Sequence, residues 1–206
     1  MLRRRRSALV AALTPVMLGA LVAGCTGQGS PPAPTSSGTA SSDTPSPTPA
    51  PTAAPTPTAD LSVPPARPDA MATPSADGAA AAASYFISLY PYAYATGDTA
   101  EWATMSGAQC AFCTRTRDGV SRVHDGDGRV TGGAIDIHEA RGTELDAGRW
   151  YSAKVIATEA PSTETDASGS RVSASEGGRY AFEVALTYAS DGWTVDAVDV
   201  NPADAG

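Results

Sequence analysis

A low-complexity segment limits how much of this chain can fold. Residues 26–68 are almost entirely Ser, Thr, Pro, Ala and Gly, as in Thr44–Pro51. Such a segment buries too little apolar surface to offset the entropy lost when it becomes ordered. Its dense prolines favour extended polyproline II, at about 3.1 Å per residue. We therefore expect residues 25–68 to form a disordered stalk that acts as a spacer, and residues 69–206 to form one folded domain with its core at about 75–200.

The chain begins with the features of an export signal. Arg3–Arg6 precede an apolar run, Ser7–Ala23, which has the shape of a signal peptide. The run is at the lower limit for a membrane-spanning helix, which needs about 20 apolar residues, so an uncleaved anchor is the weaker alternative. Leu21-Val22-Ala23-Gly24-Cys25 resembles the bacterial lipobox. The resemblance implies that residues 1–24 are a lipoprotein signal peptide and that Cys25 carries the lipid.

A lipidated Cys25 implies a location and restricts the partners. The chain would be held on the outer face of the cytoplasmic membrane and would extend into the cell wall, because two acyl chains anchor a protein stably. Removal of Arg3–Arg6 changes the formal net charge from -8 (14 basic, 22 acidic residues) to -12 (10 basic, 22 acidic). An acidic domain without a basic stripe repels phosphate backbones, which argues against nucleic acid as a partner.

The first part of the expected domain has helical periodicity. Apolar residues at three- and four-residue spacing predict a helix from Gly78 to about Tyr94, with Asp77 as its N-cap. A short helix at Thr99–Met105 would carry Trp102 inward. A third helix is expected over Thr114–Val123.

From Gly132 onward the pattern changes to the period of two that is typical of an antiparallel sheet. The expected strands are Ala134–Ala140, Trp150–Thr158, Tyr180–Tyr188 and a returning strand over Trp193–Val200. The last strand changes phase, which predicts a bulge near Asp196-Ala197. The polar stretch Pro161–Glu176 is expected to be a long hairpin loop.

Helices followed by a bent antiparallel sheet predict an α+β domain in which the sheet curls around the helices. This order resembles the cone-shaped fold of nuclear transport factor 2 and ketosteroid isomerase, over about Ser75 to Val200. The lipobox and stalk, together with Tyr94-Ala95-Thr96-Gly97-Asp98 and Cys110-Ala111-Phe112-Cys113, resemble an uncharacterised lipoprotein family of high-GC Gram-positive bacteria, whose domain has no known function. That resemblance implies no catalytic residue.

Cysteine usage predicts a disulfide. With Cys25 set aside for lipid, Cys110 and Cys113 form an even pair outside the reducing cytosol. A redox-active dithiol is the alternative, because a Cys-x-x-Cys pair that opens a helix has a lowered thiol pKa. A zinc site completed by His124 and His138 matches poorly, because 13 residues separate these histidines instead of three to five.

Other polar residues are weaker site candidates. Asp125–Gly128 superficially resembles a calcium loop but lacks the required glycine and closing glutamate, so we expect a turn there. Asp136 and His138 are weak catalytic candidates, and with Glu139 and Glu183 they alternate onto sheet faces, where carboxylates can act as acids or bases inside a concavity. A solvated strand face is the simpler interpretation of these residues. We expect no metal and no cofactor.

The sequence contains no linear catalytic motif, which favours a non-enzymatic role. The expected function is that of a tethered binding or accessory module for an envelope protein, cell-wall material or a small apolar ligand. The alternatives are a small-pocket enzyme of the ketosteroid-isomerase type that uses Asp136 with His138 or a tyrosine, a dithiol redox protein, and a purely structural spacer.

Overall fold

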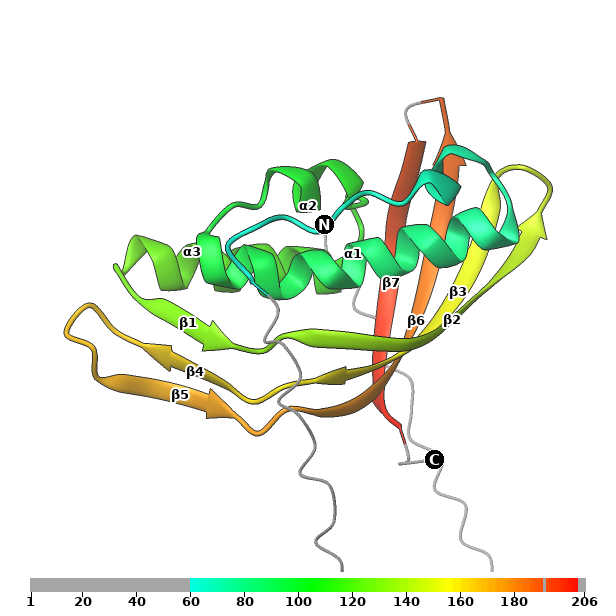
Figure 1. Ribbon diagram of the computed structural model, residues 1–206. Coiled ribbons are helices and arrows are strands. Elements are labelled where there is room, and N and C mark those ends of the chain that lie inside the picture. Colours follow the sequence, from blue (N-terminus) through cyan, green and yellow to red (C-terminus); the bar gives the residue numbers. More distant parts are fainter. Residues whose placement is uncertain (1–59, 191, 204–206) are drawn as a thin grey trace, which may run out of the picture. The chain divides into compact units, whose positions relative to one another are not determined.

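The computed structural model describes residues 60–190 and 192–203, and Cys25 and the stalk as far as residue 59 lie outside this part. Helices come first and strands follow (Figure 1). The helical elements are the 3-10 helix η1 (Asp69–Ala72), α1 (Ala76–Thr96), α2 (Ala100–Met105) and α3 (Ala111–Asp125). The strands are β1 (Arg129–Gly132), β2 (Ile135–Asp146), β3 (Trp150–Glu159), β4 (Ser162–Thr165), β5 (Arg171–Ser175), β6 (Gly178–Ala189) and β7 (Gly192–Pro202).

The helix α1 begins two residues earlier than Asp77 as N-cap would place it. Ser75 has an extended backbone, and its side-chain oxygen accepts a hydrogen bond from the Gly78 N–H at 3.0 Å. Ser75 is therefore the N-cap, because this bond satisfies a free N–H of the first helical turn. The short helix α2 places Trp102 in the core at 1% exposure, as predicted.

In residues 60–190 and 192–203, seven antiparallel strands form two sheets, one with the order β1-β4-β5 and one with the order β2-β3-β6-β7. Between the two sheets the chain passes through short breaks at Gly133-Ala134, Ala160-Pro161 and Glu176-Gly177. Gly132 and Gly177 have φ of 79° and 70°, and a Cβ on either would lie within 2.3 Å of a backbone oxygen across the break. Glycine at these positions allows the strands to bend from one sheet into the other.

The predicted cone of nuclear transport factor 2 type is wrong, because the structure has two sheets and not one curled sheet. The helices α1, α2 and α3 lie on the same side of the strands (Figure 1). The stretch Pro161–Glu176, expected to be a loop, forms β4 and β5 and supplies two of the three strands of the smaller sheet. These strands lack a buried apolar face, and β5 is exposed along its whole length, so the apolar alternation that identifies a strand is missing.

The main core lies between α1 and the larger sheet. Phe86 stacks on Trp102 with ring centroids 4.1 Å apart, and Tyr151 and Trp193 meet edge to face from the sheet side. The other large, fully buried side chains are Ile87, Leu89, Met105, Val120, Val155, Val184, Leu186 and Val195. Burial of this apolar surface stabilises the packing of helices on the sheet.

The bulge predicted near Asp196-Ala197 is confirmed. Ala185 pairs with Ala197 but Leu186 pairs with Val195, which leaves Asp196 without a cross-strand partner. The Asp196 carboxylate accepts a hydrogen bond from the Thr187 hydroxyl at 2.6 Å. The extra residue restores the alternation, so side chains on both sides of the bulge reach the core.

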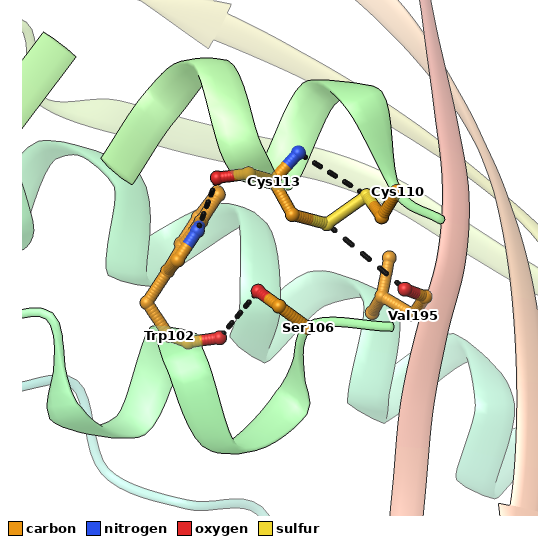
Figure 2. Close-up of a disulfide and its surroundings, with 5 residues drawn as sticks. All are labelled: Trp102, Ser106, Cys110, Cys113 and Val195. Carbon is orange, nitrogen blue, oxygen red and sulfur yellow. Dashed lines mark hydrogen bonds between the residues drawn. A yellow bond between two sulfur atoms is a disulfide. The ribbon is translucent and has the colours of Figure 1, made fainter. Parts of the chain in front are cut away.

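The disulfide between Cys110 and Cys113 is confirmed, and Figure 2 shows its surroundings. The Cys110 sulfur accepts a hydrogen bond from the Cys113 N–H at 3.1 Å and caps α3. The Trp102 indole N–H donates to the Cys113 carbonyl at 3.1 Å, and the Cys113 sulfur lies 3.9 Å from the Val195 carbonyl oxygen of β7. The bridge thus lies where α2, α3 and the larger sheet meet.

Candidate functional site

The two weak catalytic candidates lie on the outward face of the larger sheet. The Asp136 side chain is 82% exposed and its carboxylate is 3.9 Å from the His138 ring. The other ring nitrogen of His138 is 2.7 Å from the Thr158 hydroxyl. Neither residue lines the groove described below, and their role as weak catalytic candidates stays a prediction.

The residues considered for zinc or calcium binding, His124 and Asp125–Gly128, contribute to packing and to a turn. His124 packs α3 against α1, with a ring nitrogen 3.0 Å from the Tyr94 carbonyl. It lies neither with His138 nor with the cysteines, and in the described part of the chain no three His, Cys, Asp or Glu residues gather as metal ligands do. Residues Asp125–Gly128 include the turn that follows α3, as expected.

The disulfide is buried. Cys110 and Cys113 are 0% and 2% exposed. Thiol–disulfide exchange needs a thiolate to reach a sulfur atom, and burial on this scale blocks that approach. The geometry therefore favours a structural bridge over a redox dithiol.

A groove lies between the second half of α1 and the place where the two sheets meet. We call it the α1 groove. Its polar compartment has a volume of about 200 Å³ and lies over the smaller sheet; its walls include Tyr94, Arg122, Ser162, Glu164, Ser173, Ala174 and Ser175. Its apolar compartment has a volume of about 100 Å³; its walls include Ile87, Phe112, Ile135, Tyr180, Phe182 and Val200. Tyr90 and Glu159 line both compartments.

Helical and strand periodicity place these two residues in the groove. Tyr90 and Tyr94 are four residues apart on α1 and share one face, with ring centroids 5.0 Å apart. Glu159 is the last residue of β3, and strand alternation places its side chain on the same face as the buried Val155 and Ala157. Because the sheets diverge after Glu159, its side chain faces the groove instead of a packed core.

The Glu159 carboxyl is half-buried without a compensating charge. Burial raises the pKa of Glu159 above its ordinary value of 4.5. Across residues 60–190 and 192–203, no side chain forms an ion pair with it. Burial also raises the pKa of the Tyr90 phenol, and the neighbouring Tyr94 and Glu159 raise it further. The groove therefore contains an acidic group whose charged form is poorly stabilised.

The arginine that lines the polar compartment, Arg122, already has a partner. Arg122 donates two hydrogen bonds to the Glu164 carboxylate, at 2.6 and 3.2 Å, and the Ser173 hydroxyl donates to the same carboxylate at 3.2 Å. The pKa of Glu164 is lowered mainly by the bond from Arg122. This bidentate pair ties β4 to α3 and leaves Glu159 as the carboxylate without a partner.

Sequence reasoning missed the groove. Tyr90 reads as one more aromatic on an apolar helix face, and the predicted strand ended at Thr158. The alternation along β3 could have revealed Glu159, because this carboxylate falls on the side of the strand whose other residues are buried and mostly apolar. Such a residue is a candidate for binding.

Within the described residues, the fold is a small domain in which α1, α2 and α3 pack against two antiparallel sheets, with a two-compartment groove beside α1. The chain belongs to a family of unknown function (DUF6318), which it matches over residues 53–199. No curated protein matches the chain.

One similar solved structure is titled "Crystal structure of intermembrane space region of chloroplast protein ARC6". It is 10% identical, with a TM-score of 0.46, and the match covers 60% of this chain and 97% of that chain. Within the part of the chain that the structure describes, no helix is long and apolar enough to cross a bilayer.

Proposed function

We propose that this protein is a lipoprotein, anchored through Cys25 on the outer face of the cytoplasmic membrane, whose domain binds a ligand in the α1 groove. The lipobox-like Leu21–Cys25 supports the anchor, and the Ser/Thr/Pro-rich residues 26–68 support a spacer that extends into the cell wall. One observation carries the binding role: a polar and an apolar compartment meet at Tyr90 and Glu159.

Binding fits the groove better than catalysis. An activated nucleophile needs a general base within hydrogen-bond reach, and acid–base sites pair titratable groups whose pKa values are pushed apart. Glu159 has neither a histidine nor a second free carboxylate beside it, and the raised pKa of Tyr90 keeps that phenol protonated at neutral pH. Asp136 and His138 lie outside the groove.

The groove limits the size of the ligand. Its compartments have volumes of about 200 and 100 Å³. Each is smaller than a typical pocket for a drug-sized molecule, which has a volume of roughly 300–1,000 Å³. The ligand is therefore a small molecule, or a terminal group of a larger envelope or cell-wall component that inserts only its end.

The anchor is tested in cells with the full chain. We expect wild-type protein to fractionate with membranes and to incorporate an alkyne fatty acid, because Cys25 carries the lipid. Cys25→Ser should lose both properties, whereas the control Gln28→Ala should keep them. Labelling of the Cys25→Ser variant would contradict attachment at this residue.

The groove is tested by photo-crosslinking in the same cells. A photoreactive side chain at Ser175 lies in the groove wall, and one at Val172, on the same strand, provides the control because Val172 is 58% exposed and outside the groove. We expect a discrete adduct from position 175 and none from position 172. Equal adducts at both positions, or none at either, would count against the groove as a binding site.

A further inference from the structure

We infer that the α1 groove binds the protonated amine of a small ligand, with the ammonium group at Glu159 and an apolar arm in the apolar compartment. This inference rests on the proposed binding function and names the chemical class of the ligand. The juxtaposition that carries it is a carboxylate at the boundary of the two compartments, flanked by tyrosine rings.

No basic side chain of the described residues forms an ion pair with Glu159, so its carboxylate is available to a positively charged ligand group. On the α3 side, Arg122 is held by Glu164 through two hydrogen bonds. On the β6 side, Arg179 forms no ion pair with Glu159; its Nε is buried without a hydrogen-bond partner, and it interacts weakly with the exposed Glu139 of β2. A half-buried carboxylate without a cation is costly, and an ammonium group at hydrogen-bonding distance would offset that cost through a charge-assisted bond.

The rings next to Glu159 also suit a cation. Tyr90 interacts electrostatically with Glu159, its ring centroid is 5.0 Å from that of Tyr94, and Tyr180 shares the apolar compartment with Tyr90. Aromatic ring faces attract organic cations within about 6 Å of the ring centroid. A carboxylate combined with these rings therefore favours an amine over a neutral or negative head group.

The apolar compartment defines the rest of the ligand. Five of its walls are hydrocarbon or phenyl side chains: Ile87, Phe112, Ile135, Phe182 and Val200. A volume of about 100 Å³ accommodates one small ring or a short alkyl chain. The preferred ligand is therefore amphipathic, with one amine and one compact apolar group.

Other ligand classes fit less well. An anion would face Glu159 and find Arg122 already paired, so it would be repelled. A metal ion would find only one available carboxylate, because the described residues gather no set of three ligands. A neutral apolar ligand would remove water from the carboxylate without replacing it.

The test compares three probes that share one ring and differ in the head group: benzylamine, benzyl alcohol and benzoate. Their binding to the full chain in detergent is measured by calorimetry. We expect benzylamine to bind at least roughly tenfold more tightly than benzyl alcohol, about 1.4 kcal/mol, and benzoate to bind most weakly.

Two variants locate the effect. Glu159→Gln should reduce benzylamine binding to the level of benzyl alcohol, whereas Glu183→Gln, on the exposed face of β6, should leave the preference unchanged. Circular dichroism confirms that each variant is folded.

The results separate this inference from the proposed function. Equal affinity for the amine and the alcohol in the wild type, persistence of the preference in Glu159→Gln, or no binding of any probe would overturn the amine assignment. A specific crosslink at position 175 would then still support the groove as a binding site. Failure of both the probes and the crosslink would overturn both.

Discussion

Removal of the disulfide measures how much the link between α2 and α3 stabilises the domain. The perturbation is the double substitution Cys110→Ala/Cys113→Ala, which avoids an unpaired thiol. Both side chains are buried, and the bridge closes a loop between residues three apart in sequence. The double variant therefore changes a constraint inside the core.

The expected loss of stability has two parts. In the chain-entropy model, a loop this small restricts the unfolded chain by about 2 kcal/mol. The Cys110 sulfur also caps α3 by accepting the Cys113 N–H at 3.1 Å, and loss of a cap costs about 1 kcal/mol. The sum is about 3 kcal/mol, which corresponds to a fall in Tm of roughly 9 °C for a domain of this size.

The assay is denaturant unfolding of the full chain followed by circular dichroism, with Thr114→Ala as the matched control. Thr114 is exposed on α3, so its substitution should change the free energy of unfolding by less than about 0.5 kcal/mol. A loss below about 1 kcal/mol in the double cysteine variant would refute this reasoning. Turnover of insulin reduction by the wild type would refute the structural assignment of the bridge.

Three further perturbations test the packing and the groove. Gly142→Ala should lower the free energy of unfolding by about 1–3 kcal/mol in urea, because the new Cβ would lie 1.9 Å from the Ala76 carbonyl oxygen at the start of α1; stability equal to that of the wild type would contradict this close approach. Trp193→Phe should cost about 1–3 kcal/mol in thermal unfolding, because the indole N–H donates to the Met71 carbonyl at 2.8 Å in the core, and no loss would contradict that bond. Glu159→Gln should raise the free energy of unfolding at pH 7, because folding raises the pKa of the Glu159 carboxyl and the wild type loses stability as pH rises through that pKa. Below about pH 4 the carboxyl is protonated in both the folded and the unfolded state, so the two proteins should be equally stable. A more stable wild type at pH 7 would contradict the uncompensated carboxyl.

Sequence patterns predicted the helices and strands that have one apolar and one polar face. The alternation of Tyr180–Tyr188 identified β6, and the phase change before Val198 located the bulge of β7. The same logic failed for β4 and β5. These strands have no buried apolar face, and they are held by backbone pairing of β4 with β1 and of β5 with β4. The cap of α1 was misplaced by two residues because Ser75 and Asp77 are both good N-caps and only the backbone angles distinguish them.

The candidate site was less accessible to sequence reasoning than the fold. The disulfide followed from counting cysteines, but the groove depends on the approach of α1 to the place where the sheets diverge. Tyr90 and Glu159 are distant in sequence, and no motif links them. Their proximity depends on the glycine breaks between the sheets and on the packing of α1, which are long-range features of the fold.

Chemical-shift mapping tests most directly the central claim that the α1 groove is the binding site. The isotope-labelled full chain would be titrated with benzylamine, and the backbone amide shifts followed. We predict that the largest changes occur at Tyr90, Gly133 and Glu159, around the boundary of the two compartments. Changes concentrated on the outward face of the larger sheet, at Arg141 and Glu183, would contradict the account.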